Sequence, residues 1–272
     1  MPRRIALLQM CSGIDPQANA ATVVGAIGAA AMGGASMLFT PEMSALVDRN
    51  RERAKEQVVP EADSSFLAQV REAAAGAGIW VAIGSMAVLR EDGRWANRAF
   101  VIDASGEVVA RYDKIHMFDV DLATGESWRE SNAYAPGEGP VVVDTPLGRL
   151  GLTICYDLRF PALFEAYGRA ECDLIAIPAA FTVPTGQAHW HVMQRARAIE
   201  ATGYVVSAAQ VGQHADGRET FGHSLVVDPW GEVLLDMGGR DTGLSFAEID
   251  PARIAAIRSQ VPCLANKRQI AS

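Results

Sequence analysis

Cysteine is scarce in this chain of 272 residues, which carries only four. They stand far apart, with no CxxC pair, at Cys11, Cys155, Cys172 and Cys263. This spacing predicts neither a zinc site nor a disulfide framework, because both need cysteines at short, regular intervals. Unpaired cysteines fit a reducing compartment, so we expect a cytoplasmic protein.

Positive charge and long apolar runs are also in short supply. Asp and Glu outnumber Lys and Arg by 32 to 24, which gives a formal net charge of -8. That balance argues against nucleic acid or an anionic membrane as a partner, although it allows a local basic patch around a small acidic substrate. The apolar run after Arg4 stops by Met10 with no cleavage signal, and no stretch is long enough to span a membrane. We expect neither a nucleic-acid nor a membrane partner.

What the chain does have is the composition of an ordinary soluble enzyme. Hydrophobic residues make up 49% of it and charged residues 21%. The apolar residues are spread evenly, so we expect a single domain over residues 1–272 with a sizeable core.

The first half predicts alternating strands and helices. Residues 5–10 are apolar enough for a buried strand, and Asp15 before a proline is a typical helix N-cap. A second predicted strand, 36–40, leads directly into Glu42. The carboxylate is thus placed at the carboxyl end of a strand, where open α/β sheets bind their ligands.

A predicted hairpin over residues 98–112 places Lys114 just past another strand end. The stretch 114–140 then shows little periodicity and is rich in Gly, Asp, Glu and Ser. Loops of that length are usually functional or disordered, and we expect a functional one.

The stretch Gly151–Pro161, GLTICYDLRFP, carries the strongest chemical signal. Apolar residues alternate up to Cys155, and Pro161 starts a helix-prone segment, so the thiol is predicted on a tight strand-to-helix corner. Amide dipoles at a helix start and a nearby cation would favour a thiolate there. The alternative is that Cys155 is a small core residue, as free cysteines often are.

The two halves of the chain resemble each other. Residues 100–112, FVIDASGEVVARY, align with residues 225–237, LVVDPWGEVLLDM. Together with the order of strands and helices, this repeat predicts an α-β-β-α sandwich of two mixed sheets, with helices on both outer faces and a pseudo-two-fold internal repeat. The alternative is chance similarity between two hairpin turns, which draw on few residue types.

Glu42, Lys114 and Cys155 therefore follow three separate predicted strands and offer a base, a cation and a thiol. A glutamate can act as a general base towards a thiol, and a lysine can stabilise a nearby negative charge. Taken singly, the glutamate could instead be a surface cap and the lysine a solvated side chain.

The segments FTPEMS, RYDKIHMFDVD and LTICYDLRFP around these three residues resemble the nitrilase superfamily of carbon-nitrogen hydrolases, whose Glu-Lys-Cys triad is intact here. Residues 181–212 and 221–233 look most like the branch that contains deaminated-glutathione amidase and omega-amidase. The resemblance implies that Glu42 takes the thiol proton as Cys155 attacks an amide carbonyl and then activates the water that resolves a thioester, while Lys114 stabilises the oxyanion. It also implies that Glu130, in WRES, is a second site glutamate that orients Lys114 or the leaving ammonia. Glu126 lies close by and is the alternative for that role.

No phosphate-binding glycine loop or histidine-carboxylate cluster accompanies these residues in the sequence, so we expect neither a metal nor another cofactor. His189 and His191 have i, i+2 spacing on a predicted helix, which turns them apart. We expect them to be packed or exposed rather than to bind a metal.

The resemblance also implies how a substrate is bound. Arg159, four residues beyond the nucleophile, is the expected anchor for a substrate carboxylate. The alternative is a structural ion pair with Asp157 or with a carboxylate at a helix end. We expect aromatic walls and hydroxyl donors around the pocket from Phe118, Tyr156, Phe181, Thr182 and Thr185.

The resemblance implies an amidase for a small carboxylated amide with an ammonia-type leaving group, foremost one that cleaves deaminated glutathione into 2-oxoglutarate and cysteinylglycine. The alternatives are an omega-amidase acting on 2-oxoglutaramate or 2-oxosuccinamate, an N-carbamoyl amino-acid or aliphatic amide hydrolase, an acyltransferase, and a non-catalytic metabolite-binding scaffold. We expect a homodimer or higher homo-oligomer, formed by the helix after Cys155 and the helix at about 187–201, with Trp190 and Met193 in the contact.

Overall fold

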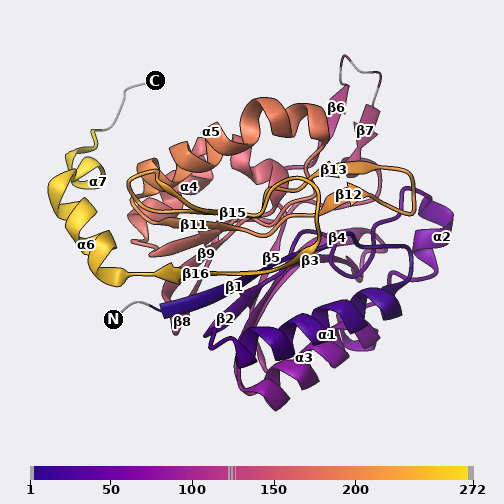
Figure 1. Ribbon diagram of the computed structural model, residues 1–272. Coiled ribbons are helices and arrows are strands. Elements are labelled where there is room, and N and C mark those ends of the chain that lie inside the picture. Colours follow the sequence, from indigo (N-terminus) through magenta and orange to yellow (C-terminus); the bar gives the residue numbers. More distant parts are fainter. Residues whose placement is uncertain (1–2, 122, 124, 126, 269–272) are drawn as a thin grey trace.

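The computed structural model describes residues 3–121, 123, 125 and 127–268. Two six-stranded sheets pack face to face, as Figure 1 shows. The strands of the first sheet lie in the order β16 (Gly243–Ile249), β1 (Arg3–Gln9), β2 (Met37–Phe39), β3 (Trp80–Leu89), β4 (Trp95–Ile102) and β5 (Val108–Asp113). The strands of the second sheet lie in the order β15 (Val233–Asp236), β14 (Leu225–Val227), β11 (Tyr204–Ser207), β10 (Leu174–Ala176), β9 (Gly148–Leu152) and β8 (Val141–Thr145).

Two longer helices cover the outer face of each sheet. Helices α1 (Pro16–Met32) and α3 (Ser65–Ala77) lie against the first sheet, and α4 (Pro161–Arg169) and α5 (Val183–Ala201) against the second (Figure 1). The remaining helices are α2 (Arg51–Lys55), α6 (Pro251–Gln260) and α7 (Cys263–Asn266), and the 3-10 helices are η1 (Glu61–Asp63), η2 (Glu130–Asn132) and η3 (Cys155–Arg159). The remaining strands are β6 (Asp119–Asp121), β7 (Ser127–Arg129), β12 (Val211–Gln213) and β13 (Glu219–Phe221). The predicted α-β-β-α sandwich is confirmed.

The uninterrupted apolar runs in the strands follow from this layering. In β1, Ile5 and Leu7 belong to the core between the two sheets, while Ala6 and Leu8 pack into the core beneath α1 and α3. Successive side chains of a strand point to opposite faces, so a strand in the middle layers must be apolar on both.

The helix boundaries follow their predicted signals with one exception. Asp15 accepts a hydrogen bond from the N–H of Gln17 and starts α1, and the helix ends at Gly33. Helix α5 begins at Val183, ahead of the expected start near Gln187, because Pro184 occupies its first turn.

The two hairpins of the internal repeat are built alike. In each turn, an aspartate Oδ1, of Asp103 or Asp228, accepts hydrogen bonds from the backbone N–H groups two and four residues later. The glycines that follow have φ of 85° and 86°, and the carbonyl of each accepts a hydrogen bond from an arginine Nε on the covering helix at 2.7 Å. The pseudo-two-fold relation therefore extends to individual hydrogen bonds.

Two details of the sequence-based prediction are wrong. The stretch 114–140 is not wholly irregular, because β6 and β7 form a short hairpin within it. Trp190 is not available for a contact with a partner subunit, because it is already buried within the single chain. Its side chain is 0% exposed, and its Nε1 donates to the carbonyl of His223 at 2.9 Å. The indole is a core residue of the single chain.

Candidate active site

Cys155 lies on a sharp corner after β9, as the sequence predicts. The strand ends at Leu152, and Cys155 opens a single 3-10 turn before α4 begins at Pro161. Its φ of 49° is a left-handed conformation that residues with a Cβ rarely adopt. The amide of Cys155 donates to the carbonyl of Pro178 at 2.8 Å, which ties the corner to the segment after β10.

A buried aspartate holds this corner in shape. Asp157 is 0% exposed, and its Oδ2 accepts hydrogen bonds from the N–H of Ile154 at 2.9 Å and the hydroxyl of Tyr112 at 2.6 Å. Its Oδ1 accepts a third from the N–H of His116 at 3.0 Å. Tyr112 belongs to the first sheet, so the carboxylate joins the corner to the opposite layer. Arg159 is not among its partners in the described part of the chain.

Glu42 reaches the thiol from the loop after β2. Its Oε1 accepts hydrogen bonds from Lys114 Nζ at 3.0 Å and Asn97 Nδ2 at 2.9 Å. Its Oε2 accepts one from the N–H of Ala180 at 2.8 Å, and the Cys155 thiol is close enough to lower the pKa of the carboxyl. Burial acts to raise the pKa of the Glu42 carboxyl, but the charge of Lys114 and these hydrogen bonds outweigh it and hold that pKa below its usual value. Glu42 is therefore ionised.

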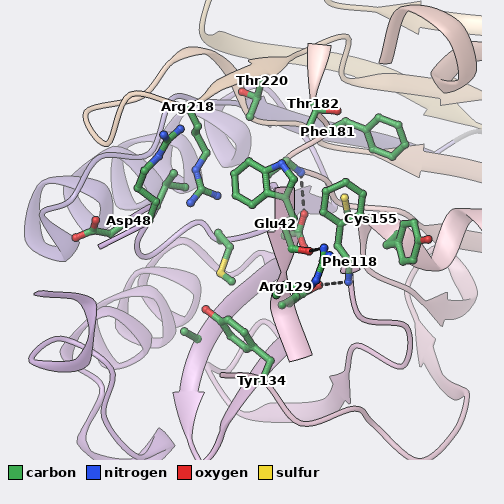
Figure 2. A pocket seen from close by; sticks show the side chains of 18 of the residues that line it. Glu42, Asp48, Phe118, Arg129, Tyr134, Cys155, Phe181, Thr182, Arg218 and Thr220 are labelled. Carbon is green, nitrogen blue, oxygen red and sulfur yellow. Dashed lines mark hydrogen bonds between the residues drawn. The ribbon is translucent and has the colours of Figure 1, made fainter. Parts of the chain in front are cut away.

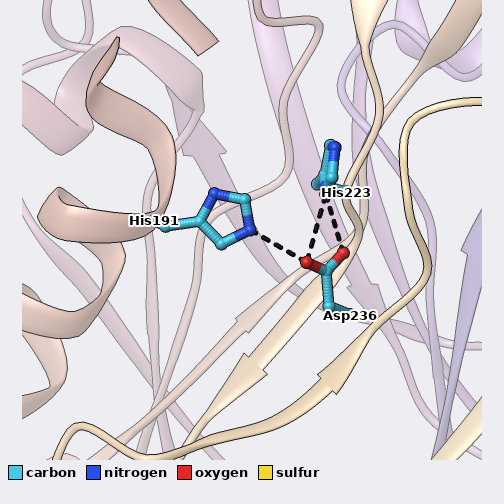
Figure 3. A group of neighbouring side chains, drawn as sticks. All are labelled: His191, His223 and Asp236. Atoms are coloured by element: carbon cyan, nitrogen blue, oxygen red, sulfur yellow. Dashed lines mark hydrogen bonds and ion pairs between the residues drawn. The ribbon is translucent and has the colours of Figure 1, made fainter. Parts of the chain in front are cut away.

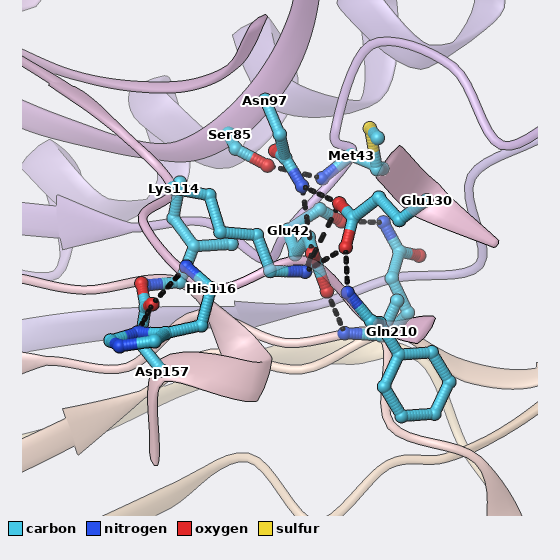
Figure 4. A network of polar contacts seen from close by, with 12 residues as sticks. Glu42, Met43, Ser85, Asn97, Lys114, His116, Glu130, Asp157 and Gln210 are labelled. Carbon is cyan, nitrogen blue, oxygen red and sulfur yellow. Dashed lines mark hydrogen bonds and ion pairs between the residues drawn. The ribbon is translucent and has the colours of Figure 1, made fainter. Parts of the chain in front are cut away.

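Lys114 lies between two carboxylates (Figure 4). Its Nζ is 3.0 Å from Glu42 Oε1 and 2.9 Å from Glu130 Oε2, and Glu130 Oε2 also accepts the N–H of Phe118 at 2.7 Å. Burial acts to lower the pKa of Lys114, but the charges of Glu130 and Glu42 raise it well above its usual value. The ammonium is fixed in place and keeps its charge.

The resting thiol is neutral. Burial and the charge of Glu42 raise the pKa of Cys155 well above its usual value, and the charge of Lys114 does not offset them. The five-residue 3-10 turn contributes little dipole, because α4 starts only at Pro161. The expectation that this corner favours a thiolate is therefore wrong for the resting site. A protonated thiol beside an ionised carboxylate is instead the starting state for general-base catalysis.

Sequence analysis missed the contribution of Asn97. This residue is 0% exposed in the middle of β4. Its Nδ2 donates to Glu42 Oε1 at 2.9 Å and to Glu130 Oε1 at 3.1 Å (Figure 4). A single amide thus holds the two carboxylates at a fixed separation around Lys114. The only signal in the sequence is a polar residue in an apolar strand.

The three triad residues line one cavity of about 710 Å³. Figure 2 shows Glu42 and Cys155 close together in it, with side chains from both halves of the chain around them. A volume of this size suits a small-molecule ligand. The predicted site residues that line it are Glu42, Lys114, Glu130, Cys155, Phe118, Tyr156, Phe181, Thr182 and Thr185.

Arg159, the expected carboxylate anchor, is not among the residues that line this cavity. Its guanidinium carbon lies 5.8 Å from the ring centre of Tyr156 and 5.4 Å from that of Phe181, and Nη1 is 3.2 Å from Nδ1 of His189. Arg159 thus stands behind two rings that do line the cavity. Glu126, the alternative second glutamate, lies outside the described residues.

Four arginines that sequence analysis assigned no role do line the cavity: Arg49, Arg51, Arg129 and Arg218. Arg129 pairs with Asp121, and Arg218 with Asp216. Within the described ranges, no carboxylate pairs with Arg49 or Arg51. The charged segment around them resembles an ordinary solvated surface in the sequence, so only the fold could place it at the cavity.

Outside this cavity, the described residues contain one further group with metal-binding side chains, formed by His191, His223 and Asp236. In the same part of the chain, no helix is long and apolar enough to cross a membrane.

The sequence pattern of the carbon-nitrogen hydrolase family matches residues 4–259. The chain is 40% identical over 271 residues to deaminated glutathione amidase of Yersinia enterocolitica, covering 98% of this chain and 94% of that protein. Its structure resembles that of the NitFhit protein of C. elegans, with a TM-score of 0.90 and 35% identity over 98% of this chain and 65% of that one.

A third relative adds chemical information. It is a mutant amidase from Nesterenkonia sp. AN1 that carries a Michael adduct of acrylamide at its active site cysteine. The two structures superpose with a TM-score of 0.79 and 27% identity, over 96% of this chain and 98% of that one. Together, the family match and the relatives confirm the resemblance in the sequence: the chain belongs to the carbon-nitrogen hydrolase family and is an amide-hydrolysing enzyme.

Proposed function

We propose that this enzyme cleaves the amide bond of deaminated glutathione through a thioester on Cys155. The observation that carries the proposal is one cavity in which Cys155, Glu42 and Lys114 meet and which four arginines also line. Relatives that cover nearly the whole chain and bear the name of this activity support it.

The proposed reaction uses the neutral thiol directly. Glu42 takes the Cys155 proton while Sγ attacks the amide carbon, and the Lys114 ammonium stabilises the resulting oxyanion. Glu42 then returns the proton to the departing amine, which leaves a thioester. The same carboxylate deprotonates the water that hydrolyses it. Glu130 and Asn97 hold Lys114 and Glu42 in position and are not themselves reactants.

Two arginines of the cavity support a substrate with two carboxylates. Of the acidic residues that line the cavity, Glu42 and Glu130 bind Lys114 and Asp48 binds Arg53, while Glu219 forms no ion pair among the described residues. Arg49 and Arg51 likewise form no ion pair there, so their guanidiniums are the groups that would bind the substrate carboxylates, although the whole chain is acidic. Deaminated glutathione carries one carboxylate on its 2-oxo acid end and another on its glycine. An omega-amidase substrate such as 2-oxoglutaramate carries only one and would leave more of the cavity empty.

For this substrate the leaving group is the amine of cysteinylglycine and not ammonia. The expectation of an ammonia-type leaving group is thus withdrawn for deaminated glutathione. Assays must follow cysteinylglycine or 2-oxoglutarate. Ammonia release would instead report the omega-amidase, N-carbamoyl amino-acid hydrolase and aliphatic amide hydrolase alternatives.

We further propose that the enzyme is cytoplasmic, which is supported by four cysteines that are all free.

The first prediction concerns the nucleophile. Cys155→Ala should abolish release of cysteinylglycine, because no other thiol contacts Glu42 in the described structure. Wild-type enzyme quenched during turnover should carry a 2-oxoglutaryl adduct on Cys155 by intact-protein and peptide mass spectrometry. The exposed Cys263→Ala variant is the control and should keep wild-type activity. A Cys155→Ala enzyme with the wild-type rate would overturn the assignment.

The second prediction concerns pH. Glu42 must be ionised and Cys155 protonated at the start of the reaction. The pKa of Glu42 lies below its ordinary value of 4.5, and that of Cys155 lies well above its ordinary value of 9.0. The plot of kcat/KM against pH should therefore be flat from about pH 5 to about pH 9. A base that titrates near pH 7, seen as an inflection there, would exclude Glu42.

The third prediction concerns recognition of the substrate carboxylates. Replacing both Arg49 and Arg51 by Met should lower kcat/KM for deaminated glutathione by roughly ten- to a hundredfold, because charge-assisted hydrogen bonds are lost. Hydrolysis of a neutral amide should change little. Arg159→Met is the matched comparison, and should slow both substrates alike if Arg159 only supports Tyr156 and Phe181. If kcat/KM fell for deaminated glutathione but not for the neutral amide, and only in Arg159→Met, Arg159 would be the carboxylate anchor after all.

The fourth prediction concerns assembly, and we propose a homodimer. The outer side of α5 and the adjoining β14–β15 hairpin expose apolar side chains at Val192 (63%), Ile199 (47%), Trp230 (50%) and Leu234 (44%), and the turn glycine of this hairpin lies against Ile199. A second copy would cover this patch. The double variant Val192→Asp, Ile199→Asp should be monomeric by light scattering. The control Met32→Asp, at the end of α1, should not. A wild-type monomer at micromolar concentration would contradict the proposal.

A further inference from the structure

A second group of reactive side chains lies where α5 meets the β14–β15 hairpin. His191 comes from α5, His223 from the segment before β14, and Asp236 from the end of β15. Figure 3 shows both imidazoles directed at the Asp236 carboxylate. The residues are far apart in sequence, and none of them lines the catalytic cavity.

The distances bring two nitrogens and a carboxylate together. His191 Nε2 is 2.9 Å from Asp236 Oδ2, and His223 Nδ1 is 2.9 Å from Oδ1. One ligand atom from each residue can be chosen so that all lie within 4.8 Å of one another. In a tetrahedral zinc site, with bonds of about 2.0 to 2.1 Å, the ligand atoms lie about 3.3 Å apart. A small outward shift of the carboxylate would therefore make room for a cation.

His223 is held rigidly in this position. It has φ of 56°, a strained conformation for a residue with a Cβ. Its N–H donates to the carbonyl of Gly238 at 2.8 Å, and its carbonyl accepts the buried indole N–H of Trp190. Its ring stacks on Phe221, with centres 4.4 Å apart. A side chain at Gly239 would meet His223 Nε2 at 3.0 Å, so the backbone approaches the ring closely there.

Asp236 is fixed as well. Its Oδ1 also accepts the N–H of Gly238 at 2.9 Å. Burial acts to raise the pKa of the Asp236 carboxyl, but hydrogen bonds from His191, Gly238 and His223 keep it below its usual value. The group is ionised, and no lysine or arginine of the described chain forms an ion pair with it.

We propose that His191, His223 and Asp236 bind one divalent cation of the zinc class. Two neutral imidazoles and one carboxylate are a ligand set that such cations prefer. The three side chains are 38%, 25% and 31% exposed, so water can complete the coordination. The cation would replace the two hydrogen bonds to Asp236 by metal bonds. It would join α5, whose first turn carries the cavity residue Thr185, to the hairpin of the second sheet.

His189 provides a matched control two residues away on the same helix. Its Nδ1 faces Arg159 at 3.2 Å and not Asp236, which agrees with the prediction that the two histidines turn apart. The expectation that neither His189 nor His191 binds a metal rested only on their spacing along one helix. The proposed partners of His191 come from 32 and 45 residues further along the chain.

The test is a zinc titration of the full chain, carried out on Cys155→Ala so that the active-site thiol cannot bind the metal. Calorimetry should give one equivalent with Kd below about 10 µM. His191→Gln and Asp236→Asn should each weaken binding by roughly a hundredfold, and His189→Gln should leave it unchanged. Zinc at a hundredfold excess over Kd should raise Tm by roughly 5 to 10 °C.

Cobalt(II) provides an independent readout that does not depend on how well the variants fold. The Cys155→Ala protein should show visible d–d bands without the near-ultraviolet charge-transfer band that thiolate ligands give, because the proposed ligands are nitrogen and oxygen. A thiolate band, a Kd in the millimolar range, or equal affinity in His191→Gln and His189→Gln would overturn the proposal. In each case the cluster would be a hydrogen-bonded brace without a metal. Because the site is separate from the cavity, these outcomes do not depend on the identity of the amide substrate.

Discussion

The structure of the site depends on one buried ammonium between two carboxylates, of which Glu42 is buried and Glu130 partly buried. Lys114 and Glu42 are 2% and 5% exposed. Moving each of these charges out of water costs several kcal/mol, and attraction to an opposite charge nearby must offset that cost. Glu42 follows a strand of the first sheet, Lys114 follows its edge hairpin, and Glu130 lies in the loop between the halves. The charges can satisfy each other only when these segments are in their native places. The polar cluster therefore specifies the geometry of the site as well as its chemistry.

The nucleophile enters this cluster from the other sheet. Cys155 is held by a left-handed backbone conformation, by the hydrogen bond to Pro178 and by the Asp157 brace, which reaches Tyr112 in the first sheet. Face-to-face packing of the sheets thus sets the distance between thiol and base. This explains why a site with so few reacting groups needs contributions from both halves of the chain.

Much of this arrangement could be predicted from the sequence, because the main site residues follow strands. Alternating apolar residues locate β9 and place Cys155 after it, and the same argument places Glu42 and Lys114. The sequence could not predict Asn97, whose role depends on which carboxylates lie across from β4. Arg49 and Arg51 lie in a charged stretch that is typical of a solvated surface, so the sequence does not indicate that they line the cavity. The sequence-based prediction that Arg159 contacts the substrate is not supported either, because its guanidinium lies behind Tyr156 and Phe181. Each of these depends on long-range packing.

The same limit explains the reversed expectation for the thiol. Local sequence indicates a corner near a helix start and a lysine, both of which stabilise an anion. The fold adds burial and the negative charge of Glu42 near the thiol, and these dominate. Two carboxylates and one ammonium already leave the resting cluster with a net negative charge, so a thiolate would add a second. Transfer of the proton to Glu42 during attack avoids that state. The negative charge then develops on the substrate oxygen beside Lys114, at the moment when Glu42 becomes neutral and no longer competes for the ammonium.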